Sequence, residues 1–163
     1  MQKKALVIID IQNDITKNYK DVIDNINQAI DWAANHQIHV IYIRHENLSA
    51  GTRTFKPDTY GSELASDLKM VSDNIFTKCK GNALSSVEFT DYIKKNELCD
   101  FYIAGADAAA CVKSTCYNLR KADYGVNVLS DCITSYDKRK IDEMLLYYES
   151  KGCNIICLND LLG

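Results

Sequence analysis

Short apolar segments alternate along the chain with stretches whose apolar residues recur at helical spacing. The segments of strand length cover residues 4–9, 38–43, 74–77, 100–104, 125–130 and 153–158. The clearest helical face between them consists of Val22, Ile23, Ile26, Ala29, Ile30 and Ala33. Alternation of this kind is typical of βαβ units. The pattern therefore predicts an α/β fold with a parallel sheet, and 163 residues are enough for one domain with a buried core.

Local signals predict helix ends and one long loop. Residues 85–88 (Ser-Ser-Val-Glu) match the capping-box pattern, which predicts the start of a helix that buries Phe89 and Ile93. Gly152 is expected to end the last long helix, because glycine is common just after a helix terminus. The stretch 45–60 has no clear period. Loops of this length in a compact domain tend to be functional.

Charge and composition limit the partners of this chain. The net charge is -3, and Lys and Arg form no run. Neither nucleic acid nor an anionic membrane surface is therefore an expected partner. The first apolar run ends at Asp10, which makes it too short for a signal-peptide core or a membrane span. We expect a cytoplasmic protein.

The cysteines and histidines argue against a disulfide framework and against a metal site. The chain has seven cysteines, an odd number, which indicates reduced thiols in a sequence without an export signal. Most of them are expected to fill the core. The three histidines, His36, His39 and His45, lie near no cysteine in the sequence, so the ligand spacing of a zinc site is missing. No metal ligand is predicted.

Three chemically capable residues stand at the predicted strand ends. Asp10 ends the first strand, Lys78 ends the third, and the fourth leads to Cys111. Ligands of open parallel sheets bind beyond the carboxyl ends of the strands, where the strand order reverses. If the first and fourth strands are neighbours, Asp10 and Cys111 come close together, and Lys78 reaches in from two strands away. Each residue taken alone also has a structural explanation: a turn, a solvated charge or a buried thiol.

The turn before Cys111 suggests what the three residues do. An apolar strand and the small residues 104–110 deliver Cys111 to the start of a predicted helix, where the helix dipole favours thiolate and lowers the thiol pKa. Asp10 would accept the thiol proton, Lys78 would orient Asp10, and Cys111 would attack an electrophilic carbon. The backbone N–H groups of Asp107 and Cys111 are the expected oxyanion donors.

These residues belong to a longer set of motifs. The chain resembles the isochorismatase-like cysteine hydrolases, the superfamily of nicotinamidases and N-carbamoylsarcosine amidase, along essentially its whole length and in the family's order. The matching segments are 5–14 (Ala-Leu-Val-Ile-Ile-Asp-Ile-Gln-Asn-Asp), 76–78 (Phe-Thr-Lys), 82–84 (Asn-Ala-Leu), 103–115 and 125–132.

The resemblance carries expectations about fold and site. It implies a three-layer α/β/α sandwich around a six-stranded parallel sheet in a single domain spanning residues 1–163. It assigns the family's catalytic triad to Asp10, Lys78 and Cys111, and a cis peptide bond to Ala106 and Asp107. It further implies a homo-oligomer, a dimer or larger, and no cofactor.

The sequence also departs from the family pattern. Nicotinamidase-like members carry a metal-binding Asp and several His between the second and third strands, whereas residues 44–61 offer only His45, Glu46 and Asp58. A metal site is therefore not expected. Asp107 stands where the family has a small apolar residue, which puts a carboxylate beside the oxyanion donors.

The sequence thus predicts a cysteine hydrolase of a small amide or ureido compound, acting through a thioester. Gln12, Phe55 and Tyr60 are weaker candidates for substrate contact. One alternative is a catalytically idle member that serves as a binding or scaffold subunit, which Asp107 and the short loops favour. Another is a flavodoxin-like nucleotide binder, although Gly105 is the only glycine of its turn and a glycine-rich phosphate loop is missing.

Overall fold

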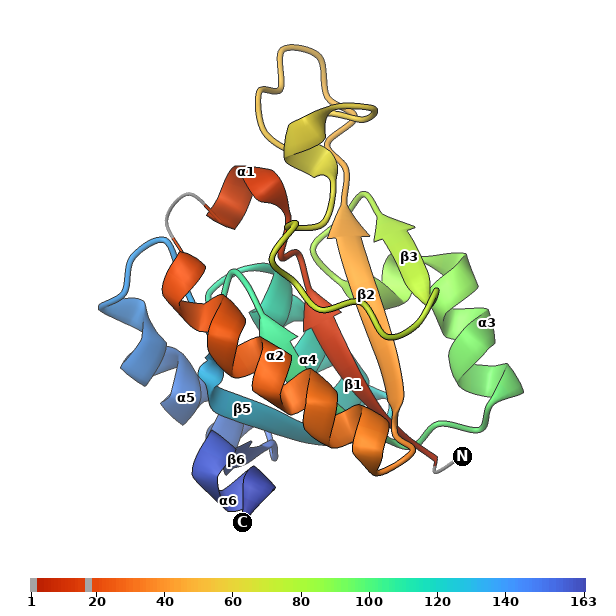
Figure 1. Cartoon of the computed structure of the whole chain (residues 1–163), viewed down its shortest axis with the longest axis vertical. Coiled ribbons are helices and arrows are strands. Elements are labelled where there is room, and N and C mark those ends of the chain that lie inside the picture. The colour runs from red at the N-terminus through yellow and green to blue at the C-terminus, as the bar shows by residue number, and fades with distance from the viewer. Residues whose placement is uncertain (1–2, 17–18) are drawn as a thin grey trace.

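A six-stranded, all-parallel sheet forms the middle layer of the computed structural model, which describes residues 3–16 and 19–163 (Figure 1). The strands are β1 (Lys4–Ile9), β2 (His39–His45), β3 (Ile75–Lys78), β4 (Asp100–Gly105), β5 (Gly125–Ile133) and β6 (Asn154–Ile156). Their spatial order is β3-β2-β1-β4-β5-β6. The strand order reverses between β1 and β4, so the carboxyl ends of these two strands meet at the switch point.

Helices cover both faces of the sheet. The helices are α1 (Asn13–Thr16), α2 (Lys20–Asn35), α3 (Val87–Lys95), α4 (Cys111–Lys121), α5 (Lys140–Ser150) and α6 (Leu158–Leu162), with 3-10 turns η1 (Tyr60–Ser62) and η2 (Ala83–Ser85). Helices α2 and α6 lie on one face, and α3, α4 and α5 lie on the other (Figure 1). The predicted three-layer α/β/α sandwich is confirmed.

The central strand β1 is buried from both sides, which explains its unbroken apolar sequence. Val7 and Ile9 pack into the core under α4, and Leu6 and Ile8 pack into the core under α2; all four are fully buried. Each such side chain contributes roughly 1.5–3 kcal/mol relative to an exposed position. Because β1 is held this firmly, the residue at its carboxyl end has a well-defined position.

Most predicted elements are present, with shifted ends. β2 runs to His45 because Arg44 and His45 still pair with Thr77 and Lys78 of β3. The capping-box pattern in residues 85–88 places the N-cap of α3 at Ser85. In the structure the N-cap is the next residue, Ser86, whose hydroxyl accepts the Phe89 N–H at 3.3 Å.

Two glycines with positive φ stand at the ends of elements, one after α5 and one at the end of β4. Gly152 follows α5 with φ +89, as the pattern predicted for a helix end. Gly105 of β4 pairs with Ile9 of β1 and has φ +123; a Cβ atom at this position would lie 2.2 Å from the Ile9 carbonyl oxygen. Glycine is therefore required where β1 and β4 approach the site.

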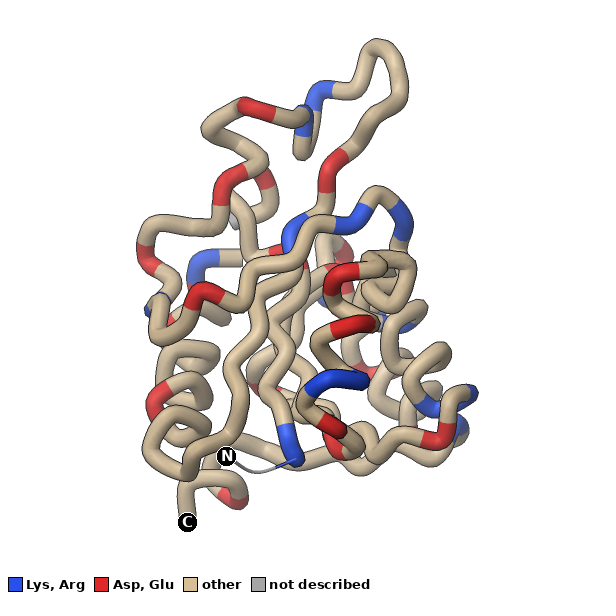
Figure 2. Tube along the Cα trace, turned by 90° about the vertical axis from the view of Figure 1, so that its right-hand side faces the viewer, with Lys and Arg blue, Asp and Glu red and all other residues tan. Residues whose placement is uncertain are grey.

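The long segment 46–59 projects beyond the carboxyl edge of the sheet, at the top of Figure 1. It closes on itself through the Asn47 N–H, which donates to the Phe55 carbonyl at 2.9 Å. On the side of the molecule shown in Figure 2, acidic and basic residues are interspersed. Within the described ranges, no helix has the length and apolar character needed to cross a bilayer.

Candidate active site

Asp10 follows β1 directly and turns its carboxylate into the protein. Its backbone has φ 57, in the left-handed region that Asp tolerates better than most residues, and its N–H donates to the Ile43 carbonyl at 3.0 Å. The residue is only 1% exposed. Among the described residues, Asp10 Oδ1 is a buried side-chain oxygen with no hydrogen-bond partner. This oxygen is therefore available to a proton donor.

Lys78 reaches Asp10 from the end of β3, two strands away. Its ammonium nitrogen lies 3.1 Å from Asp10 Oδ2 and 3.3 Å from Cys111 Sγ, and the residue is 2% exposed. A buried ammonium needs partners for its charge and for its three N–H donors. The side chain of Lys78 thus links the carboxylate and the thiol, as the strand-end pattern predicted.

Cys111 is the first residue of α4 and is half-buried. The small residues before it form the tight connection from β4, in which Ala110 is the N-cap. In the described part of the chain, the N–H groups of Asp107 and Cys111 donate to no other group. They are free to stabilise an oxyanion next to the sulfur.

The electrostatics of the thiol differ from the sequence expectation. Burial, and then the Asp10 carboxylate, raise the pKa of Cys111 to about 12, although Lys78 opposes the rise. Burial also raises the pKa of Asp10 above its ordinary value, against the pull of Lys78. The prediction of a lowered thiol pKa from the helix dipole is wrong, because it took no account of desolvation or of the adjacent carboxylate. The resting site holds a thiol beside a carboxylate whose proton affinity burial increases.

The turn that carries the expected oxyanion donors has the cis peptide bond that the resemblance implies. The Ala106–Asp107 peptide bond is cis. The Asp107 carboxylate accepts from the Ala109 N–H at 2.8 Å, the Ser135 hydroxyl at 2.7 Å and the Tyr136 N–H at 2.8 Å. Both carboxylate oxygens are thus directed to donors of the turn and of the β5–α5 loop.

The structure gives the three weaker candidates different surroundings. Gln12 is fully buried: its amide N–H groups donate to the carbonyls of His45 and Ser62, and its oxygen accepts the His45 N–H. It therefore fastens the end of β2. Tyr60 is 70% exposed and lines a hollow that contains none of the three catalytic candidates. Phe55 packs its ring edge-on against His45 at a centroid distance of 5.9 Å.

Phe55 also lines a hollow of about 270 Å³ whose lining residues include Asp107 but not Asp10, Lys78 or Cys111. The residues around this hollow are Asp14, Ile15, Tyr19, Thr54, Phe55, Asp107 and Tyr136. Because it is lined by Asp107, whose N–H is an expected oxyanion donor, the hollow adjoins the turn that leads to Cys111. Its volume lies just below the range of about 300–1,000 Å³ that is typical of small-molecule sites.

His45 is the functional candidate that sequence analysis did not assign. Its Nδ1 lies 2.8 Å from Lys78 Nζ. The only signal in the sequence is its place at the end of a strand. Ligand atoms of Asp10, His45 and Cys111 all lie within 4.8 Å of one another, the spacing of a metal site. However, the Lys78 ammonium contacts an atom of each of the three, so a metal ion would meet a fixed positive charge and does not fit.

Comparison with known proteins places this geometry in a family. The family model described as the isochorismatase domain matches residues 4–160. The isochorismatase family protein YrdC of Bacillus subtilis (strain 168) is 23% identical, over 98% of this chain and 88% of the relative.

Solved structures share the fold. An isochorismatase family protein from Desulfovibrio vulgaris superposes with a TM-score of 0.90 at 17% identity, covering 99% of this chain and 97% of that one. N-carbamoylsarcosine amidase from Thermoplasma acidophilum gives a TM-score of 0.85 at 17% identity, covering 99% and 100%. Pyrazinamidase of Pyrococcus horikoshii, solved with zinc, gives 0.86 at 18% identity, covering 96% and 99%. The match of the domain model over nearly the full length shows that the chain belongs to the isochorismatase family.

Proposed function

We propose that the protein is a cysteine-dependent hydrolase of a small amide-like C–N bond in a carboxamide, carbamoyl or ureido compound. The observation that carries the proposal is the Lys78 ammonium, which contacts Asp10 at 3.1 Å and Cys111 at 3.3 Å. A thiol beside a buried base, under a shared cation, suits nucleophilic catalysis. The names of two fold neighbours, a pyrazinamidase and an N-carbamoylsarcosine amidase, support a substrate of this class.

In the first half of the reaction, Asp10 takes the proton of the Cys111 thiol as the sulfur attacks the substrate carbonyl carbon. The C–S bond forms, and the carbonyl π electrons move to oxygen. The N–H groups of Asp107 and Cys111 stabilise this oxyanion, and each donor is worth about 3 kcal/mol of barrier. The C–N bond then breaks, and the leaving nitrogen takes the proton from Asp10. Ammonia or an amine departs, and a thioester remains on Cys111.

In the second half, Asp10 accepts a proton from water as the water oxygen attacks the thioester carbon. The same two N–H groups stabilise the second oxyanion. The C–S bond then breaks, the acid product leaves, and the sulfur recovers the proton from Asp10. The raised pKa of Asp10 suits this cycle, because a stronger base accepts each proton more readily.

Two features refine the proposal. The hollow lined by Phe55 and Tyr136 favours a substrate with a flat, partly apolar group. In this chain the Lys78 ammonium contacts each of the three potential metal ligands, Asp10, His45 and Cys111. No step of the mechanism uses a metal.

The alternative of an idle binding subunit loses part of its support. It rested on Asp107 and on the short loops. The Asp107 carboxylate accepts from Ala109, Ser135 and Tyr136 and is therefore no free charge at the oxyanion position. The hydrolase is the function that we retain.

The test is a screen of small carboxamide, carbamoyl and ureido compounds for ammonia release, with Cys111→Ala as the control. We expect turnover by the wild-type protein only, and an acyl adduct on Cys111 that hydroxylamine removes. Turnover that survives in Cys111→Ala would contradict the mechanism. Absence of both turnover and adduct across all three compound classes would favour the binding subunit.

A further inference from the structure

We propose that His45 is a positioning residue that sets the Lys78 ammonium through its Nδ1 atom, and that Asn47 connects this contact to the loop 47–55. The inference deepens the proposed function and rests on it, since Lys78 matters only if Asp10 and Cys111 react. It assigns a chemical role to the side chain that sequence analysis left without one.

The hydrogen bonds of Lys78 require His45 to accept. The ammonium has three N–H donors and no lone pair. Its three neighbours are Asp10 Oδ2 at 3.1 Å, Cys111 Sγ at 3.3 Å and His45 Nδ1 at 2.8 Å. Each neighbour takes one donor, and the shortest contact is to the imidazole. His45 Nδ1 must therefore carry no proton.

The contact of the second ring nitrogen of His45, Nε2, indicates the same tautomer. Asn47 Nδ2 donates to the Thr54 carbonyl at 3.0 Å, so the amide oxygen of Asn47 faces the opposite way, toward His45. His45 Nε2 lies 2.8 Å from this oxygen. An oxygen can only accept, so Nε2 carries the proton. Constraints from both ends thus fix a neutral imidazole with its proton on Nε2.

The backbone of His45 is also fastened. Gln12 accepts the His45 N–H at 2.8 Å and donates to the His45 carbonyl at 2.9 Å, and the Phe55 ring packs against the imidazole. The ring can therefore neither turn nor withdraw without breaking several contacts. The rigid imidazole of His45 thus holds the flexible side chain of Lys78 in one position. A catalytic ammonium requires such fixed positioning.

The loop 47–55 is coupled to the centre through this imidazole. The Asn47 N–H donates to the Phe55 carbonyl, and the Phe55 N–H donates to Asp14 Oδ2 at 2.7 Å. Phe55 also lines the hollow that we assign to substrate. A ligand that moves Phe55 therefore also moves Asn47, and with it the acceptor that fixes the tautomer of His45.

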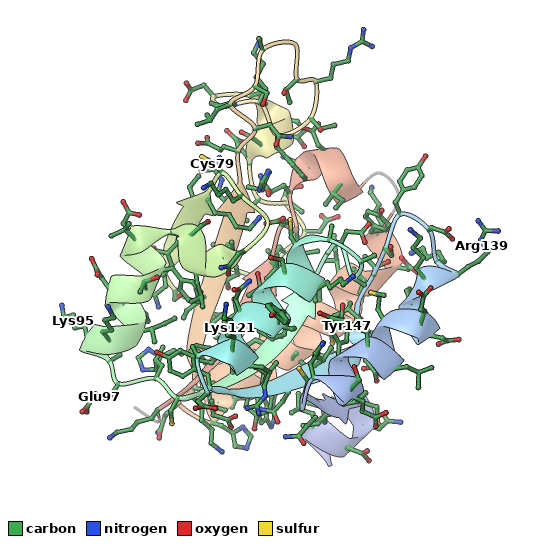
Figure 3. The ribbon with its side chains drawn as sticks, turned by 180° about the vertical axis from the view of Figure 1, so that it is seen from behind. Cys79, Lys95, Glu97, Lys121, Arg139 and Tyr147 are labelled. Carbon is green, nitrogen blue, oxygen red and sulfur yellow. The ribbon has the colours of Figure 1, made fainter. Side chains whose placement is uncertain are left out.

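The test compares His45→Asn with His45→Leu. The Oδ1 atom of asparagine branches from the same Cγ position as Nδ1 of histidine and keeps an acceptor for Lys78, whereas leucine keeps bulk only. The readout is alkylation of Cys111 by iodoacetamide between pH 7 and 10, followed by peptide mass spectrometry. Cys79, exposed after β3 in Figure 3, is the internal control.

We expect His45→Leu to slow Cys111 alkylation about tenfold, because a displaced ammonium no longer lowers the thiol pKa; one pKa unit corresponds to this factor. His45→Asn should stay within about threefold of wild type, and Asn47→Ala should fall between the two. Nitrogen-15 NMR of the wild-type protein should show His45 with a bare Nδ1 and a protonated Nε2.

A protonated Nδ1 of His45 would overturn the inference, and so would equal alkylation profiles for the Asn and Leu variants. A change in melting temperature without a change in the alkylation profile would also refute it, because it would indicate a purely structural role. These measurements need no substrate. Failure of the hydrolysis screen with the expected alkylation pattern would count against the proposed function alone.

Discussion

Helix α4 carries two cysteines less than two helical turns apart, and their surroundings are very different. Cys111 is half-buried at the N-terminus of the helix, 3.3 Å from the Lys78 ammonium. Cys116 is 1% exposed in the core under α4, and its thiol shares a hydrogen bond with that of Cys153. Both thiols have raised pKa values, Cys111 through burial and Asp10, Cys116 through Cys153 and burial.

The difference teaches that a raised thiol pKa alone does not single out Cys111, the nucleophile that we propose. What distinguishes Cys111 is a base that can take its proton, a cation that stabilises the product of that transfer, and free N–H groups beside it. Cys116 lies in the apolar core beside another thiol, that of Cys153. The following experiments test this distinction.

The largest expected effect separates the two thiols directly. Cys111→Ala should lower kcat by about 10⁴-fold or more, because nothing else in the site can form the thioester. Cys116→Ala should leave kcat nearly unchanged and lower the free energy of unfolding by about 1–2 kcal/mol through lost packing. Steady-state kinetics and urea unfolding measure the two quantities. Equal losses of kcat in both variants would remove the distinction.

The second-largest effect is expected when the Lys78 ammonium, which contacts both Asp10 and Cys111, is removed. Lys78→Met should lower kcat by about 10²–10⁴-fold, and should destabilise the protein by about 3 kcal/mol at pH 7, because a buried carboxylate is left unpaired. The raised pKa of Asp10 means that the fold accommodates its protonated form better. Stability of the variant should therefore recover as the pH falls toward about 4, near the unfolded carboxyl pKa.

The matched control for this variant is Lys80→Met, on the exposed segment after β3. It should change neither the activity nor the pH dependence of unfolding. A Lys78→Met protein as stable as wild type at pH 7 would mean that Asp10 is already protonated in the native state.

When the base is removed, the expected change in the rate of Cys111 alkylation is smaller and of opposite sign. Asp10→Asn should abolish hydrolysis yet speed alkylation of Cys111 by about tenfold, because the carboxylate that raises the thiol pKa is gone. Cys116 should stay unlabelled in the folded protein. Slower alkylation in Asp10→Asn would show that the carboxylate assists thiol attack even on iodoacetamide.

The smallest effect concerns pH. Asp10 must be ionised to accept the thiol proton, and burial raises its pKa above 3.8. The acid limb of the profile of kcat/KM should therefore have its midpoint above the ordinary aspartate value, with activity lost as pH falls through it. The profile with an identified substrate checks this, and a midpoint at or below the ordinary value would contradict the assigned base.

Sequence periodicity predicts the fold well where one physical cause dominates. The fully buried β1 and the single apolar face of α2, from Val22 to Ala33, are set by hydrophobic burial alone. Element ends are less predictable, since they depend on partners. β2 extends to His45 only because β3 lies beside it and ends in Lys78.

Some features of the candidate site can likewise be predicted from the sequence, and others cannot. The placement of Asp10, Lys78 and Cys111 at one edge follows from the rule for parallel sheets. The thiol pKa does not follow, because desolvation depends on neighbours that are remote in sequence. The contact between His45 and Lys78 joins two strand ends across a long loop, and no local pattern reports it.

Gly105 gives the site an unusual vulnerability. A methyl group at this position would clash with the main chain of β1, since its carbon would lie 2.2 Å from the Ile9 carbonyl oxygen. The two strands that deliver the carboxylate and the sulfur would be forced apart while the core beneath them stayed whole. Attempts to re-engineer this protein for new substrates should therefore leave that glycine untouched and vary the outer hollow instead.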